Sequence, residues 1–135
     1  MKKLLFISFL LTSCLCSYSQ FHIGDSPEQC MVDVLQQKNY SEPKILNSYP
    51  KCVYWEDNLS NQYFASFKDD RKIFKLSIAI GNRDVFNVFV QEYNKTYLLN
   101  SANEWLAAVE NKAYLIHAYY FPDNPIKYEI TYIKL

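Results

Sequence analysis

The strongest constraint on the fold is an order of sequence patterns that occurs twice. A helical stripe of apolar residues, first at about 26–38 and again at about 83–97, is followed each time by segments in which apolar and polar residues alternate. Helical and alternating periods each place the apolar side chains on one face of an element. We therefore predict an α+β fold, an antiparallel sheet with two helices packed on one face, in a pseudo-repeated αβββ-αβββ order.

Capping residues predict where the first helix starts. Ser26 is a capping residue, Pro27 suits the first helical position, and Gln29 completes a capping box. Turn-forming residues separate the alternating segments, and in the third of these we expect Phe74 and Leu76 to share the buried face with Ile78 and Ile80. The predicted strands are 52–56, 62–68, 73–80, 105–109, 112–120 and 127–135, with loops at 39–50 and 100–103.

The N-terminal segment predicts export. Lys2 and Lys3 precede an apolar run at 4–11, and small residues follow, which is the order of a secretory signal peptide. Ser17 and Ser19 satisfy the preference of a signal peptidase for cleavage after residue 19. The apolar run is far shorter than the about 20 residues that span a bilayer. We expect residues 1–19 to be removed and 20–135 to form a single domain in the periplasm, at the cell surface or outside the cell.

A lipid anchor is the alternative for this segment. The residues Leu11-Thr12-Ser13-Cys14 resemble a bacterial lipobox, in which Cys14 would be lipidated and would tether the protein to a membrane. The brevity of the leader before Cys14 and the placement of Ser17 and Ser19 favour ordinary cleavage.

The net charge of the chain limits the classes of partner. Loss of Lys2 and Lys3 leaves 12 basic residues against 14 acidic ones, and this near-neutral balance argues against a nucleic-acid partner.

Cys30 and Cys52 remain after cleavage, and two cysteines in an oxidising compartment suggest one disulfide. Two buried free thiols are the alternative.

Motifs that resemble catalytic ones have simpler explanations. Gly24-Asp25-Ser26 resembles the nucleophile block of GDSL esterases, but that family also needs an aspartate three residues before its histidine, and Tyr114 stands there before His117. We assign Ser26 to helix capping and His117 to a packed core position. His22 is placed at the start of the domain, where chain ends are seldom ordered, so we expect no metal site.

Other enzymatic chemistry is equally poorly supported. The carboxylate pairs Glu56-Asp57 and Asp69-Asp70 fall in predicted turns, where such residues are selected for backbone reasons. Only Gly24 and Gly81 occur in the chain, so no glycine-rich phosphate loop can be built and no cofactor is expected.

The aromatic content is the feature that points to binding. The chain has 12 Tyr, and tyrosine is enriched where proteins bind partners, because its ring is apolar and its hydroxyl is polar. Tyrosines on the last two predicted strands cannot all face inward, so some must reach the outer side of the sheet. The candidate binding residues are Tyr114, Tyr119, Tyr120, Tyr128 and Tyr132.

A family resemblance follows from the spacing of several motifs. The run from Gly24 to Gln29 that opens a helix resembles the helix-plus-three-strand repeat of β-lactamase-inhibitor-like proteins and of the small outer-membrane-assembly lipoproteins related to them. Residues 23–80 carry the likeness best, through Tyr54-Trp55, Phe64, Phe67 and Asp70. The resemblance implies a non-catalytic fold whose sheet face binds another protein.

Three functional hypotheses remain. We expect an exported, non-enzymatic protein that recognises another protein through an aromatic-rich sheet face, as an inhibitor or immunity protein would. The alternative is a carbohydrate-binding module of the cell envelope, and a more distant one is a small hydrolase that uses loop carboxylates. They predict an exposed apolar patch, a groove lined with coplanar rings, and a pocket with two converging carboxylates, respectively.

Overall fold

The computed structural model describes residues 22–109, 111–124 and 127–135. The predicted signal peptide and Cys14 lie outside these residues. Two helices and eight strands occur in the described chain, in the order α2, β1–β4, α3, β5–β8. The elements are α2 (Pro27–Leu35), β1 (Lys44–Leu46), β2 (Lys51–Glu56), β3 (Gln62–Phe67), β4 (Ile73–Ile80), α3 (Arg83–Thr96), β5 (Leu98–Ser101), β6 (Glu104–Val109), β7 (Lys112–Tyr120) and β8 (Tyr128–Lys134).

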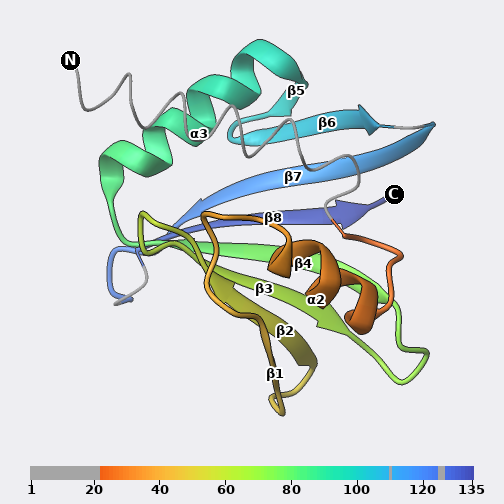
Figure 1. The fold of residues 1–135 in the computed structure, drawn as a ribbon. Helices are drawn as coiled ribbons and strands as arrows, with labels where there is room; N and C mark the ends of the chain where they lie inside the picture. The colour runs from red at the N-terminus through yellow and green to blue at the C-terminus, as the bar shows by residue number, and fades with distance from the viewer. Residues whose placement is uncertain (1–21, 110, 125–126) are drawn as a thin grey trace.

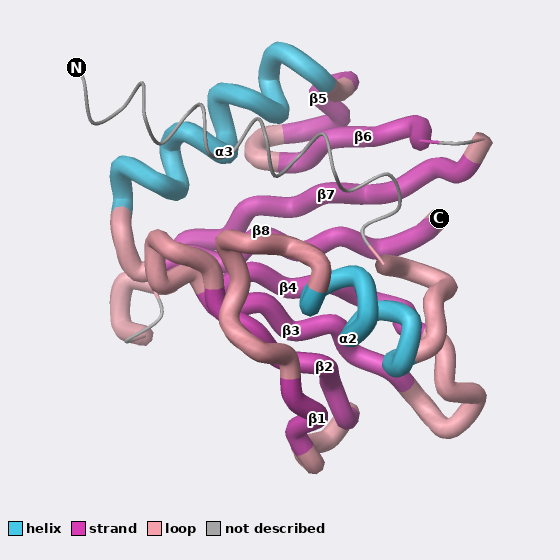
Figure 2. The backbone as a smooth tube through the Cα atoms, viewed as in Figure 1, coloured by secondary structure: helices cyan, strands magenta, loops and turns pink. Residues whose placement is uncertain are grey.

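All eight strands form one antiparallel sheet in the order β1-β2-β3-β4-β8-β7-β6-β5 (Figures 1 and 2). Strands β1–β4 are therefore one meander and β5–β8 another, and the two meet where β4 pairs with β8. The fold is α+β, as the sequence predicts.

Two strands were not predicted. β1 and β5 lie at the two edges of the sheet, so each pairs with one neighbour only. They span three and four residues, and β5 is exposed along its whole length. Each half therefore has four strands after its helix, rather than three.

Ser26 caps the start of α2 as the sequence indicates, but the Gln29 side chain donates to Asp33 Oδ1 instead of completing a capping box. Ser26 Oγ accepts a hydrogen bond from the backbone N–H of Gln29 at 3.1 Å. Asn82 caps α3 in the same manner, since its Oδ1 accepts from the backbone N–H groups of Asp84 and Val85. Side-chain acceptors at these positions satisfy N–H groups that have no partner inside a helix.

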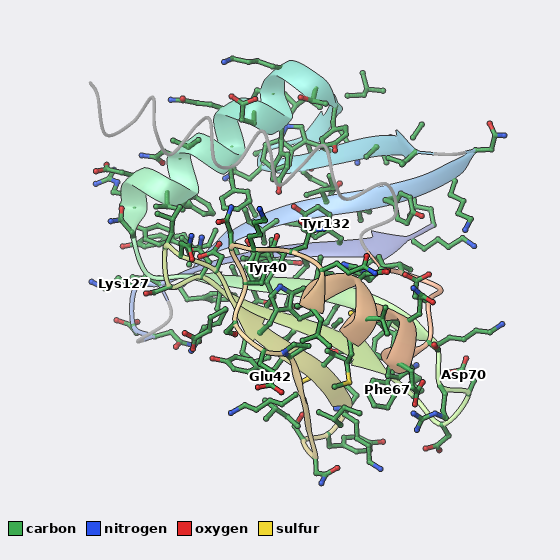
Figure 3. All side chains as sticks on the ribbon, viewed as in Figure 1. Tyr40, Glu42, Phe67, Asp70, Lys127 and Tyr132 are labelled. Carbon is green, nitrogen blue, oxygen red and sulfur yellow. The ribbon has the colours of Figure 1, made fainter. Side chains whose placement is uncertain are left out.

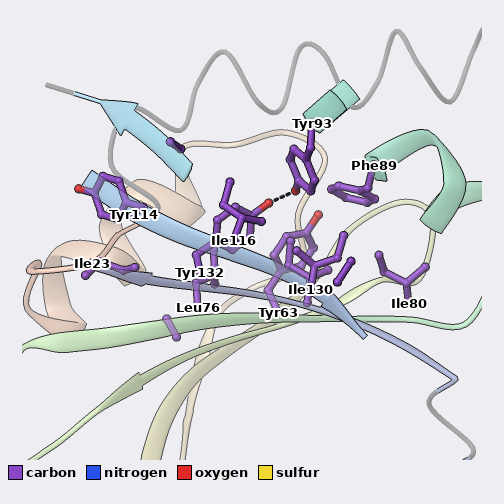
Figure 4. Close-up of a cluster of buried hydrophobic side chains, with 14 of the residues drawn as sticks. Ile23, Tyr63, Leu76, Ile80, Phe89, Tyr93, Tyr114, Ile116, Ile130 and Tyr132 are labelled. Carbon is purple, nitrogen blue, oxygen red and sulfur yellow. Dashed lines mark hydrogen bonds between the residues drawn. The ribbon is translucent and has the colours of Figure 1, made fainter. Parts of the chain in front are cut away.

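The core combines both helices with alternate residues of the strands. Cys30 and Val34 of α2, and Phe89 and Tyr93 of α3, belong to one buried cluster (Figure 4). Tyr93 and Tyr132 share a hydrogen bond between their hydroxyl groups inside it. The strand members of the cluster are Val53, Trp55, Tyr63, Ala65, Phe67, Ile73, Leu76, Ile78, Ile80, Trp105, Ala107, Tyr114, Ile116, Ala118, Tyr128, Ile130 and Tyr132.

One predicted core residue lies elsewhere because of a bulge. The pairing of β3 with β4 shifts register between Ser66 and Phe67, so that Phe67 pairs with Ile73 rather than with Phe74. Ile73 is buried in the core, whereas Phe74 is half-buried and contacts the Lys68 ammonium through its ring. An extra residue in one strand reverses the faces on either side of it.

The predicted disulfide is corrected by the placement of the two cysteines. Cys30 and Cys52 are both buried free thiols. Cys30 lies in the core cluster with Val53, the residue next to Cys52 in β2. Because successive strand residues point to opposite faces, the sheet itself separates Cys52 from Cys30.

No helix in the described part of the chain is both long enough and apolar enough to cross a membrane.

Candidate binding site on the sheet

The strand side chains that alternate with the core residues form a second surface, which we call the outer face. Its side chains align across the strands, because directly paired residues of an antiparallel sheet share a face. One row runs through Leu98, Leu106, Leu115, Ile133, Lys75, Ser66, Cys52 and Leu46. Apolar side chains thus occupy the half of this row that belongs to β5–β8, and polar or small ones follow in β4, β3 and β2.

The apolar half of the row is accessible. Leu98 has 69% of its surface exposed and Ile133 has 41%. Leu106 and Leu115 lie between them and are half-buried. Four contiguous aliphatic side chains across four strands make an apolar patch of the kind that marks an interaction surface.

A groove with a volume of about 270 Å³ lies on the other half of the outer face. Its floor is hollow because the residues there are small: Cys52, Ser66, Ser77 and Ala79. The other residues that line the groove are Ser48, Tyr49, Pro50, Phe64, Lys75, Phe121, Asn124 and Glu129.

The groove floor carries hydroxyl side chains of largely buried residues. Ser66 is 7% exposed and Ser77 is 8% exposed, and Thr131 pairs with Ser77 in the adjacent strand β8. Among the described residues, neither Ser66 nor Ser77 forms a side-chain hydrogen bond. Because they have no partner within the described chain and line the groove, these two hydroxyls are available to a ligand or to water.

Opposite charges stand at the two ends of the groove. Lys75 pairs with Ile133 in the sheet, and Glu129 pairs with Ala79. Both charged side chains line the groove and are half-buried, and neither forms an ion pair within the described chain. A ligand that offers both signs of charge would satisfy both.

A ladder of three rings follows β7 beside the groove. The rings of His117 and Tyr119 are stacked with centroids 4.0 Å apart and planes at 4°, and Tyr119 stacks on Phe121 at 5.7 Å. His117 Nδ1 lies 3.3 Å from Glu104 Oε2. The side chain of His117 is 32% exposed, so the expectation of a packed core position is wrong: His117 lies on the outer face.

The five candidate tyrosines separate into two groups. Tyr114, Tyr128 and Tyr132 are buried in the core cluster (Figure 3 labels Tyr132) and have almost no surface to offer a partner. Tyr119 and Tyr120 are 36% and 59% exposed. Tyr119 belongs to the ring ladder, whereas Tyr120 stacks on Tyr128 at 5.2 Å. The structure therefore leaves two of the five as accessible candidates.

Comparison of the chain with protein-family models, with curated proteins and with solved structures found no match. The residues of the outer face are therefore the basis for inferring a function.

The catalytic-looking motifs have structural roles. Asp57 Oδ1 accepts hydrogen bonds from the backbone N–H groups of Leu59 and Asn61, and its Oδ2 accepts from the Tyr63 hydroxyl at 2.8 Å. Asp70 lies in the turn between β3 and β4 and accepts from the backbone N–H of Lys72 (Figure 3). Of the described residues, one carboxylate lines the groove, that of Glu129.

A second cluster, which sequence reasoning missed, stands at the start of α2. His22 Nδ1 lies 3.6 Å from Asp25 Oδ2 and 3.9 Å from Asp33 Oδ2. One ligand atom from each residue lies within 4.8 Å of the others, so these three side chains have the types and spacing of a divalent cation site. The signal in the sequence was a histidine followed by aspartates three and eleven positions later.

Burial favours the neutral forms of His22 and Asp25 in this cluster. Burial lowers the pKa of His22, against the effect of the two nearby carboxylates. Burial also raises the pKa of Asp25, with a further contribution from the charge of Asp33. The His22 ring packs edge-on against Trp55 at 5.8 Å, and Asp33 accepts a hydrogen bond from Gln29 at 2.8 Å. The contact with Trp55 anchors the segment before α2 to the core, whereas the Gln29–Asp33 hydrogen bond lies within α2.

Proposed function

We propose that this chain is an exported, non-catalytic protein that binds another protein through the outer face of its sheet. The observation that carries the proposal is the accessible apolar row of Leu98, Leu106, Leu115 and Ile133. Interfaces that bind proteins combine such an apolar centre with aromatic residues and a polar rim. Tyr119 and Phe121 supply the aromatic residues next to this row.

We further propose that the two halves of the chain are structural repeats and that both helices cover the same side of the sheet. Membership of both helices in one core cluster supports this arrangement, as does the occurrence of four strands after each helix. A sheet covered on one side only leaves its other side as a broad surface for docking.

Carbohydrate binding is the competing function, and the ring geometry argues against it. A sugar stacks on the exposed face of an aromatic ring, whereas the rings of His117, Tyr119 and Phe121 stack on one another. The inner faces of the ladder are therefore covered, and Tyr119, the middle ring, has neither face free for a sugar. A small hydrolase of the kind considered above needs two converging carboxylates, and the described residues of the groove supply only Glu129.

Site-specific photocrosslinking tests the proposal. A benzophenone amino acid replaces Ile133 on the outer face in one variant and Lys95 of α3, whose side chain is 72% exposed, in the control variant. In the native host, light should produce an adduct of protein mass from position 133 and none from position 95. Unlabelled wild-type protein should compete for the adduct, whereas the Ile133→Asp variant should not.

Other outcomes separate the alternatives. Equal adducts from both positions, or none from position 133, would contradict a specific protein-binding face. If position 133 gives no adduct of protein mass but an adduct that soluble cell-envelope oligosaccharides reduce, the result would instead favour carbohydrate binding.

A further inference from the structure

We propose that the groove on the outer face receives an extended loop of the partner protein, one that carries a basic side chain for Glu129 and an acidic side chain for Lys75. This inference rests on the proposed function and names the chemistry of the partner. The length of the groove, its floor and the charges at its ends support this ligand.

The distance between the two charged residues sets the length of the bound segment. Lys75 pairs with Ile133, and Glu129 precedes Ile133 by four residues in β8. At about 3.4 Å per strand residue, the backbones at Lys75 and Glu129 are roughly 14 Å apart. An extended segment covers that distance in about four residues, so the partner's two charges should be three to five positions apart.

The floor of the groove suits a peptide backbone. A serine hydroxyl both donates and accepts hydrogen bonds, and an extended backbone presents N–H and C=O groups to match. Ser66 and Ser77 are each more than nine-tenths buried, line the groove and have no side-chain hydrogen bond in the described chain. Cys52 and Ala79 beside them are small enough for a backbone to approach closely.

The charges and the neighbouring surface select the class of ligand. A polyanion would be repelled by Glu129, and a neutral sugar would leave both Lys75 and Glu129 without a partner. The apolar row begins at Ile133, directly beside Lys75 in the sheet. A loop that projects from a folded protein can fill the groove while the body of that protein covers the apolar row.

Selection from a random peptide library displayed on phage tests the charge pattern. The purified protein should enrich peptides with one basic and one acidic residue three to five positions apart, in one preferred order. The Lys75→Glu/Glu129→Lys double variant should enrich the reverse order. No enrichment, or the same order with both proteins, would overturn the proposal, provided that circular dichroism shows the variant to be folded.

The serine hydroxyls give a second test that does not depend on the charges. An enriched peptide should bind the Ser66→Ala and Ser77→Ala variants with a Kd roughly two- to tenfold weaker, the usual effect of losing one hydrogen bond. The thermal midpoint of these variants should stay the same, because neither substitution removes a side-chain hydrogen bond within the described chain. A lower midpoint with unchanged peptide binding would show a structural role and contradict the proposal.

The two proposals fail differently. If the groove does not bind the loop, peptide selection fails while crosslinking from position 133 still yields a protein adduct. If the chain binds no protein through the outer face, the crosslinking fails as well.

Discussion

The two faces of the sheet are built from the same strands but with different residues. On the core side, β6, β7 and β8 contribute Trp105, Ile116 and Tyr132, each at most 1% exposed. On the outer side, the same strands contribute Leu106, Leu115 and Ile133, which are half-buried or exposed. The core face is aromatic and filled, whereas the outer face combines an apolar row with a groove over small polar residues.

Aromatic content alone therefore does not locate a binding surface in this protein. Most of the tyrosine and tryptophan rings serve the core, where large rings fill the space between helices and sheet. The outer face is distinguished by what is small or unpaired, above all Ser66 and Ser77. Stability should therefore depend on one face and recognition on the other.

Adjacent residues on opposite faces give the largest contrast. Trp105→Ala should lower the free energy of unfolding by about 3 to 5 kcal/mol, because it leaves a cavity in the core. It also removes a hydrogen bond from Trp105 Nε1 to Asn94 Oδ1, 2.9 Å long. Leu106→Ala, on the next residue, should cost about 1 kcal/mol. Urea denaturation of both variants checks this, and equal losses would show that the faces are not energetically distinct.

Alkaline pH should weaken the core face. Burial raises the pKa of Tyr93 and of Tyr132 above the usual value near 10. The folded protein therefore keeps these protons after the unfolded chain has lost them, so stability is complete below about pH 10 and falls as the pH rises further. The limiting slope is about 1.4 kcal/mol per pH unit for each hydroxyl.

A double variant isolates the contribution of the pair to that slope. Tyr93→Phe/Tyr132→Phe should show a smaller loss of stability between pH 10 and higher values than the wild type, followed by thermal denaturation. An unchanged slope would mean that other tyrosines cause the effect.

The hydroxyl pair itself gives a smaller effect. Tyr93→Phe removes the hydrogen bond to the Tyr132 hydroxyl inside the core and should cost about 1 to 3 kcal/mol at neutral pH. In a double-mutant cycle with Tyr132→Phe, the two losses should not add, because both variants break the same bond. Additive losses would contradict an energetic coupling between the two rings.

Cys30 and Cys52 allow the two faces to be compared with the same substitution, because Cys30 lies in the core and Cys52 borders the groove. Cys30→Ser places a hydroxyl among apolar core residues and should cost about 1 to 2 kcal/mol. Cys52→Ser borders the groove, with Ser48 Oγ 3.7 Å from its sulfur, and should cost less than about 0.5 kcal/mol. Reducing agent should leave the wild-type melting curve unchanged, whereas a shift on reduction would reveal a disulfide.

Much of the fold was predictable because its local signals are strong. The capping residue Ser26 and the apolar stripe after Asn82 place both helices, and alternation places six of the eight strands. β1 and β5 were not predicted. Each is a short strand at an edge of the sheet that pairs with one neighbour, so its residues show almost no alternation between buried and exposed positions.

The candidate site was harder to predict because a face is defined by register. The bulge beside Phe74 cannot be read from residue types, and it alone decides whether Ile73 or Phe74 faces the core. Likewise Tyr114 and Tyr119 are both tyrosines of β7, but an odd separation places them on opposite faces. The groove depends on Ser66 and Ser77, which lie 11 residues apart in the chain and meet only through the pairing of β3 with β4.

The order of the strands also dictates when this protein can fold. β8 is the last strand in the chain, but it lies in the middle of the sheet, between β4 and β7. The two meanders cannot join until those seven residues have been synthesised, so the sheet closes only after β8 is available. Loss of β8 would leave two separate half-sheets, and β4 and β7 would each have an unpaired edge.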